Sequence, residues 1–161
     1  MTLRNAFNSL LAIAFFVMPL YALGQSGDNS QPCRVKVAAP LPGATADNEV
    51  MVEGTAHLPA GGFLWVFIGL RGQAGYWPQG GGPAQLDNEG KWEVLARLGT
   101  ADDKGRAFVI VPVIVDSTTH EMLQRYVNES SKTHDFQPFP KLPGVVQGCP
   151  IVPVNVTRNR T

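Results

Sequence analysis

Short segments of this 161-residue chain alternate apolar and polar residues at every second position, and turns rich in Gly and Pro separate those segments. The clearest example is residues 91–98, in which the apolar positions are Trp92, Val94, Ala96 and Leu98. A period of two is typical of a β-strand with one buried face. The same pattern at 34–37 and 50–57 predicts two more strands, and the long apolar runs 63–70 and 107–115 predict strands in the middle of a sheet.

The amino-acid composition favours the same fold class. Hydrophobic residues make up 44% of the chain, which excludes a disordered protein, and charged residues make up only 16%. The 17 Gly and 13 Pro residues favour short strands and frequent turns over helices. We therefore expect an all-β protein, a single β-sandwich of about seven strands that spans residues 33–158. One core between its two sheets is expected to contain Trp65, Trp92, Val94, Phe108 and Ile110.

One short helix is expected before the last strand. Thr118 and Glu121 have the spacing of a capping box, with Thr118 as the N-cap residue. An apolar stripe over residues 122–127 continues the helical pattern, and a Pro-rich return begins at Ser130. The last strand is predicted at 149–157.

Residues 1–24 have the features of a secretory signal peptide. Arg4 precedes an apolar segment at 10–18, and Ala22 and Gly24 place small residues at the positions that signal peptidases require. The alternative is a retained membrane anchor, but the uncharged segment is shorter than the roughly 20 residues that a spanning helix needs. We expect cleavage after Gly24 and no membrane span in the mature form.

A polar tether is expected at 25–32, between the signal peptide and the folded domain. The predicted location is outside the cytoplasm, either periplasmic or extracellular. The formal net charge of 0, with 13 basic and 13 acidic residues and no basic cluster, excludes the usual electrostatic surface for a nucleic acid.

The two cysteines of the chain, Cys33 and Cys149, lie near the two ends of the predicted domain. Two lone cysteines in an exported domain are expected to form a disulfide bond. Free thiols or a metal pair are the alternatives, although no Cys-x-x-Cys or Cys/His spacing supports a metal. Cys149 lies on the opposite parity to the valines of the predicted last strand, which is unfavourable for the disulfide unless a bulge turns its sulfur inward.

A series of short motifs between Val35 and Val127 matches one type of domain in order. The motifs are Pro40-Leu41-Pro42-Gly43-Ala44, Val50-Met51-Val52-Glu53-Gly54-Thr55-Ala56, Leu58-Pro59-Ala60-Gly61, Leu64-Trp65-Val66-Phe67, Tyr76-Trp77-Pro78-Gln79, Gly90-Lys91-Trp92 and the helix after Asp116. In these features the chain resembles bacterial immunoglobulin-like β-sandwich domains. The resemblance implies a non-catalytic accessory module. Independently of this resemblance, Gly54 in the strand predicted at 50–57 is expected to permit a bulge or a close contact, since a glycine otherwise weakens a strand.

No convincing catalytic or metal-binding set is present in the sequence. The histidines His57, His120 and His134 are scattered, and Gln124 replaces the second histidine of a zinc-binding helix. Asp116, Ser117 and His120 lie close together, but they suit a helix start better than a catalytic triad. We expect no enzymatic activity, no metal and no cofactor.

Aromatic residues in a Gly-rich segment, residues 72–83, are the best candidates for ligand binding. Tyr76 and Trp77 lie beside Arg71 and Gln79, and aromatic faces with amide and guanidinium neighbours suit a sugar ring or a peptide. The alternative is that Trp77 packs against the sandwich edge and is structural. Tyr76 is therefore the stronger candidate for binding.

Two classes of function remain open from the sequence. The first is an exported non-enzymatic binding or accessory module that recognises a protein or glycan of the cell envelope or a host surface, through residues 71–82 and an exposed strand edge. The second is a small secreted enzyme or inhibitor that acts on cell-envelope material. A concave pocket with two or more convergent titratable groups would favour the enzyme.

Overall fold

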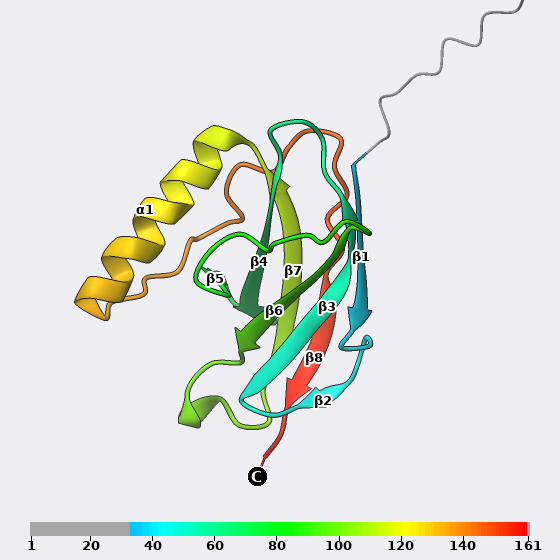
Figure 1. The fold of residues 1–161 in the computed structure, drawn as a ribbon. Helices are drawn as coiled ribbons and strands as arrows, with labels where there is room; N and C mark the ends of the chain where they lie inside the picture. Colours follow the sequence, from blue (N-terminus) through cyan, green and yellow to red (C-terminus); the bar gives the residue numbers. More distant parts are fainter. Residues whose placement is uncertain (1–32, 161) are drawn as a thin grey trace, which may run out of the picture.

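The computed structural model describes residues 33–160, which form two β-sheets and one long helix (Figure 1). The smaller sheet has the strand order β1-β3-β6, and the larger sheet has the order β2-β8-β7-β4-β5. The helix α1 precedes the last strand, as expected, so the chain is mostly β with one helix. The elements are β1 (Arg34–Ala39), β2 (Thr45–Ala46), β3 (Glu49–His57), β4 (Phe63–Leu70), β5 (Tyr76–Pro78), β6 (Lys91–Arg97), β7 (Ala107–Val115), α1 (Ser117–Thr133) and β8 (Val154–Arg158).

The main hydrophobic core lies between the two sheets. Side chains of the smaller sheet, including Trp92 and Val94, pack against side chains of the larger sheet, including Phe108 and Ile110. All four are buried, which confirms the sequence prediction that they share one core. The predicted alternation in β6 is also confirmed, because buried and exposed residues alternate along the whole strand.

A second hydrophobic cluster lies between the larger sheet and α1, on the face of the sheet that points away from the main core (Figure 1). Trp65 belongs to this cluster, packed near Leu123 and Val127 of the helix. The expectation that Trp65 lies in the core between the sheets is therefore wrong. β4 is apolar on both faces because it is buried on both faces, and its sequence does not distinguish one face from the other.

The helix α1 is longer than predicted at both ends. Asp116, and not Thr118, is the N-cap residue, because its carboxylate accepts a hydrogen bond of 2.7 Å from the backbone N–H of Thr119. The helix continues through Ser130 to Thr133 and ends at His134, which adopts a left-handed conformation. The carboxylate of Asp116 competes better than a threonine hydroxyl for this position because its negative charge also favours the helix N-terminus.

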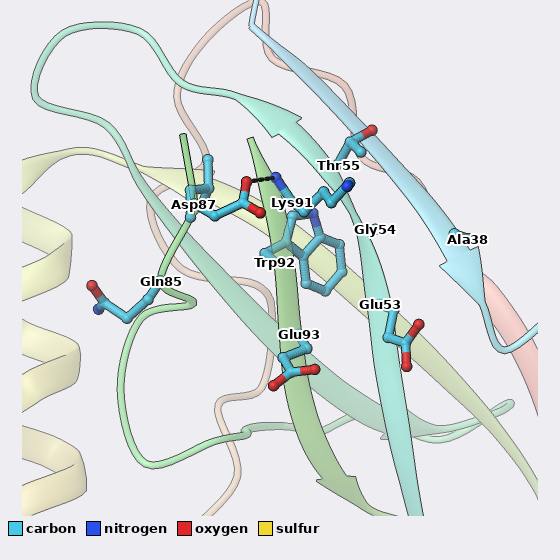
Figure 2. Close-up of a pocket in the computed structure, with 10 residues that line it drawn as sticks. Ala38, Glu53, Gly54, Thr55, Gln85, Asp87, Lys91, Trp92 and Glu93 are labelled. Carbon is cyan, nitrogen blue, oxygen red and sulfur yellow. Dashed lines mark hydrogen bonds between the residues drawn. The ribbon is translucent and has the colours of Figure 1, made fainter. Parts of the chain in front are cut away.

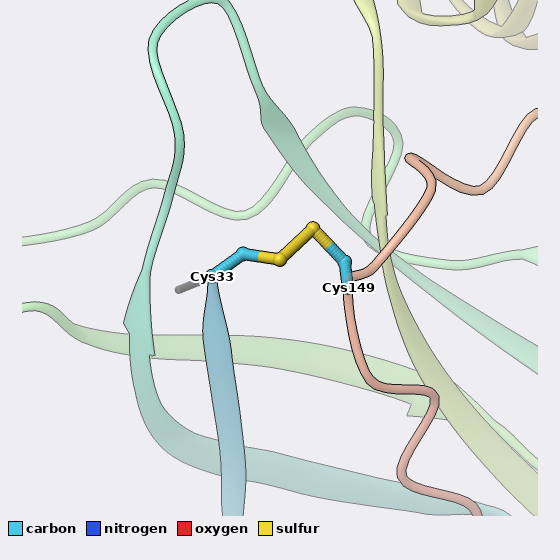
Figure 3. The surroundings of a disulfide bond; sticks show 2 residues. All are labelled: Cys33 and Cys149. Atoms are coloured by element: carbon cyan, nitrogen blue, oxygen red, sulfur yellow. A yellow bond between two sulfur atoms is a disulfide. The ribbon is translucent and has the colours of Figure 1, made fainter. Parts of the chain in front are cut away.

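The predicted disulfide bond joins Cys33 and Cys149, whose Cα atoms are 5.3 Å apart (Figure 3). Cys149 is not part of the last strand, which begins only at Val154. The expected strand over 149–157 is therefore too long, and the unfavourable parity of Cys149 has no consequence. A disulfide bond is consistent with an oxidising compartment.

Gly54 of β3 lies directly opposite Trp92 of β6. A Cβ atom at Gly54 would collide with the backbone carbonyl of Lys36 and would lie 2.7 Å from the Trp92 ring. The predicted close contact at Gly54 is therefore confirmed, since only glycine leaves room for the indole and for β1 at this position.

The expected signal peptide at 1–24 and tether at 25–32 lie outside the described residues. Within residues 33–160, no helix combines the length and the apolar character that a membrane span requires.

Candidate functional site

Tyr76 and Trp77 form a short strand and not a flexible loop. They belong to β5, which pairs with β4 at the edge of the larger sheet. Tyr76 is also fixed on its other side, because its backbone N–H and C=O form hydrogen bonds of 2.8 and 2.9 Å with the backbone of Phe139. The Tyr76 ring packs against the cluster beneath α1 and is half-buried. The interpretation of 72–83 as a continuous loop is wrong at these residues.

Trp77 points to the other side of β5, toward the main core. Its indole Nε1 donates a hydrogen bond of 2.9 Å to the backbone carbonyl of Phe136, which lies after α1 in the sequence. This bond fixes the orientation of the ring and attaches the segment after the helix to the sheet edge.

Gln79 connects the two sheets at their shared open side. Its backbone N–H donates to the carbonyl of Val66 in the larger sheet over 2.8 Å. Its side-chain Oε1 accepts a hydrogen bond of 2.8 Å from the backbone N–H of Arg97 in β6. Gln79 therefore holds the end of β5 and the end of β6 in place on the two sides of the space between them.

A groove of about 520 Å³ lies in this space, between the end of β5 and the turn after β6. Trp77 and Gln79 line the groove, whereas Arg71 is exposed and does not line it. The structure therefore brings together two of the four predicted binding residues. Most of the groove wall is apolar, and its other lining residues are Ile68, Leu70, Pro78, Arg97, Gly99, Thr100, Asp103, Phe108 and Phe136.

The two charged residues that line the groove are both already bonded. Arg97 donates two hydrogen bonds, of 2.7 and 3.3 Å, to one carboxylate oxygen of Glu49. The Asp103 carboxylate accepts hydrogen bonds from the backbone N–H and hydroxyl of Thr100 and from Arg106. The bond from the Thr100 backbone lowers the pKa of Asp103 most, so this carboxylate is ionised at neutral pH and stabilises the turn.

A second hollow, of about 660 Å³, lies on the outer side of the smaller sheet and along the free edge of β6 (Figure 2). Glu53 of β3 and Glu93 of β6 are directly opposite each other there. Gln85, on the segment that precedes β6, lies apart from that strand and forms the far wall of the hollow. Like charges in opposite positions of a sheet destabilise it.

The residues suggested for a hydrolase do not converge on a common point. Asp116 caps the helix, and Nδ1 of His120 accepts a hydrogen bond of 3.3 Å from the buried indole of Trp65. Across residues 33–160, no group of three or more His, Cys, Asp and Glu side chains could hold a metal ion.

Phe136 and Thr100 are groove residues that were not predicted from the sequence. Phe136 is 59 residues from Trp77, and only the return of the chain after α1 brings the two together. No local sequence pattern reports such a contact.

The sequence matches no known protein-family model. A search of curated proteins likewise found no similar sequence.

Proposed function

We propose that this chain is an exported, non-enzymatic binding module with an immunoglobulin-like sandwich fold. In this proposal it recognises a protein or a glycan of the cell envelope or of a host surface through the groove beside β5. The two sheets around one core support the proposed fold. The disulfide bond between Cys33 and Cys149 supports an exported, oxidising location. The sequence resemblance rests on the separate series of motifs between Val35 and Val127.

The observation that carries the proposed binding role is the character of the groove wall. It is largely apolar and includes Trp77 and the exposed ring of Phe136, and its volume is within the usual range of ligand sites. Arg97 and Asp103 are held by other residues of the chain, so neither is poised to act as a general acid, base or nucleophile. This supports binding over catalysis.

Binding to immobilised glycans, peptidoglycan fragments and extended peptides tests the proposal. Phe136 is 49% exposed, so Phe136→Ala should leave the fold intact and weaken the affinity for a true groove ligand by about 1–2 kcal/mol. Leu41→Ala is the matched control, since Leu41 is 70% exposed and does not line the groove. A ligand that binds the unchanged protein, Phe136→Ala and Leu41→Ala with equal affinity does not use the groove. The proposal is contradicted if Phe136→Ala weakens the binding of no ligand in the screen.

A further inference from the structure

The polar side chains that line the groove beside β5 are bonded within the chain. The Gln79 amide is used at both ends: its Nε2 donates hydrogen bonds of 3.2 Å to the carbonyls of the two preceding residues, and its Oε1 accepts the bond from the backbone of Arg97. The Thr100 hydroxyl donates a bond of 3.1 Å to the carboxylate of Asp103. Little hydrogen-bonding capacity is therefore left for a ligand on these side chains.

The backbone carbonyls of the groove wall are engaged as well. The carbonyl of Phe136 accepts the bond from the Trp77 indole. In the turn after β6, the guanidinium of Arg158 donates to the carbonyls of Leu98 and Thr100. Arg158 is only 7% exposed and belongs to β8, so it satisfies these carbonyls without presenting its charge at the surface of the groove. The wall is therefore chemically apolar even where it contains peptide groups.

Each charged side chain beside the groove has an opposite charge next to it. Asp103 pairs with Arg106 at 2.8 Å. The side chain of Arg97 lies on the outer face of the smaller sheet, where it faces Glu49 across the strand pair and bonds it at 2.7 Å. A charged ligand would have to compete with one of these ion pairs.

We propose that the occupant of this groove is an uncharged, apolar side chain of a partner protein, aliphatic or aromatic, and not a glycan. This inference rests on the proposed binding role of the groove and decides between the two partner classes given there. The hydroxyl groups of a sugar need new hydrogen bonds when they leave water, and the described wall has few groups left to supply them. An apolar side chain loses no hydrogen bond on entering, and it buries its surface against Trp77 and Phe136.

The rim of the groove favours a protein over a lipid. An apolar centre surrounded by polar and charged groups is the usual anatomy of a protein–protein interface. The anionic headgroup of a lipid would instead require an unpaired cation at the mouth. The charges there, on Arg97 and Asp103, are both paired.

Phe136 is held in place for this contact by the chain itself. The bond from Trp77 fixes its carbonyl, and the carbonyl of the next residue, Gln137, accepts a bond of 2.6 Å from the Tyr126 hydroxyl. The ring of Phe136 nevertheless remains 49% exposed. Because its backbone is already ordered, Phe136 loses less conformational freedom when a partner binds than a residue of a free loop would.

The test begins with peptides selected from a random-sequence library on the purified, disulfide-bonded protein. An array of envelope and host glycans and a saturated fatty acid are tested in parallel. Phe136→Ala identifies the ligands that use the groove, and Leu41→Ala is the control. We expect groove-dependent peptides to share one apolar residue. Replacing that residue with asparagine, which resembles leucine in shape, should weaken binding at least about tenfold, because its amide would find no partner in the groove.

A matched pair of variants tests the apolar character of the wall from the side of the protein. Phe136→Leu keeps an apolar side chain and should retain most of the affinity for the selected peptides. Phe136→Asn is similar to leucine in size and should weaken binding at least about tenfold. Thermal unfolding of both variants verifies that the fold is retained. Equal affinities of the two variants for these peptides overturn the inference.

The remaining outcomes separate this inference from the proposed function. A glycan whose binding is weakened by Phe136→Ala overturns the inference but supports the binding role of the groove. A fatty acid that binds there in place of peptides overturns the inference as well. Groove-dependent peptides whose essential residue is charged have the same consequence. If no peptide, glycan or fatty acid is affected by Phe136→Ala, both the inference and the proposed role of the groove are wrong.

Discussion

The indole N–H of Trp65 donates a hydrogen bond of 3.3 Å to Nδ1 of His120, and the imidazole of His120 stacks on the ring of Phe63 with the centroids 3.9 Å apart. Trp65 and Phe63 belong to β4, and His120 lies in the first turn of α1. An imidazole that accepts at Nδ1 carries its proton on Nε2 when neutral. The first turn of the helix is thus attached to the sheet by one polar and one aromatic contact.

Replacing His120 with Phe preserves the aromatic stack and removes the acceptor. The N–H of the fully buried Trp65 is then left without a partner, so we expect a loss of about 1–3 kcal/mol in the free energy of unfolding. Denaturant unfolding of His120→Phe measures this loss. Glu121→Ala, at the exposed next position, is the control, and an equal loss in both variants would show that the hydrogen bond is unimportant.

Asp116→Ala should destabilise the protein by about 1 kcal/mol, because the side chain of Asp116 caps α1. Thr118→Ala should change the stability little, since Thr118 lies within the first turn and is exposed. The same unfolding measurement compares the two. A larger loss for Thr118→Ala would support the capping box predicted from the sequence.

The helix shows what local sequence can and cannot specify. The apolar stripe predicted the buried positions Leu123 and Val127. Both Asp116 and Thr118 are good cap residues, and sequence spacing alone favoured Thr118 because of Glu121. No local sequence pattern predicted the extension of the helix to Thr133. Tertiary packing stabilises this last part of the helix, where Ser130 is buried.

The pH dependence of stability should include a contribution from Asp103. Hydrogen bonds from Thr100 and Arg106 lower its pKa in the folded protein, whereas the unfolded value is about 3.9. The folded state is therefore stabilised above the unfolded pKa, and this stabilisation is lost as the pH falls through the folded pKa. Asp103→Asn should be less stable than the unchanged protein at pH 7, and the difference should diminish in acid. A difference that stays constant from pH 7 to about pH 2 would contradict this assignment.

Tyr76→Ala should lower the stability by about 2 kcal/mol, because the ring is half-buried against the cluster beneath α1. Thermal or denaturant unfolding measures the loss. Arg71→Ala, at an exposed position in the preceding turn, should have almost no effect. An unchanged melting temperature for Tyr76→Ala would instead favour a ring that is free to contact a ligand.

Gly54→Ala should destabilise the protein by at least about 1–3 kcal/mol, because the added methyl group would collide with the Lys36 carbonyl and crowd the Trp92 ring. Thr55→Ala, one residue further along β3 with its side chain exposed, is the matched control. Similar unfolding curves for the two variants would show that β1 and Trp92 can move aside at low cost.

The candidate groove could be predicted only in part. Trp77 and Gln79 were identified because aromatic and amide residues occur together in a Gly-rich segment. Their environment was not predictable, since Phe136 reaches Trp77 only after α1, and the partner of Gln79 is the backbone of a different sheet.

The position of β8 has a consequence for the rate at which this chain folds. β8 lies between β2 and β7, and β2 pairs with no other strand of the described chain. Thr45 and Thr157 are paired although they are far apart in the sequence, and buried Arg158 bonds the carbonyl of Leu98 over 3.0 Å. Contacts of such large sequence separation require closure of a long loop, and they are typical of slowly folding proteins. The larger sheet cannot be completed until the C-terminal strand has been synthesised, so a chain truncated before Val154 would leave β2 and one edge of β7 without a neighbour.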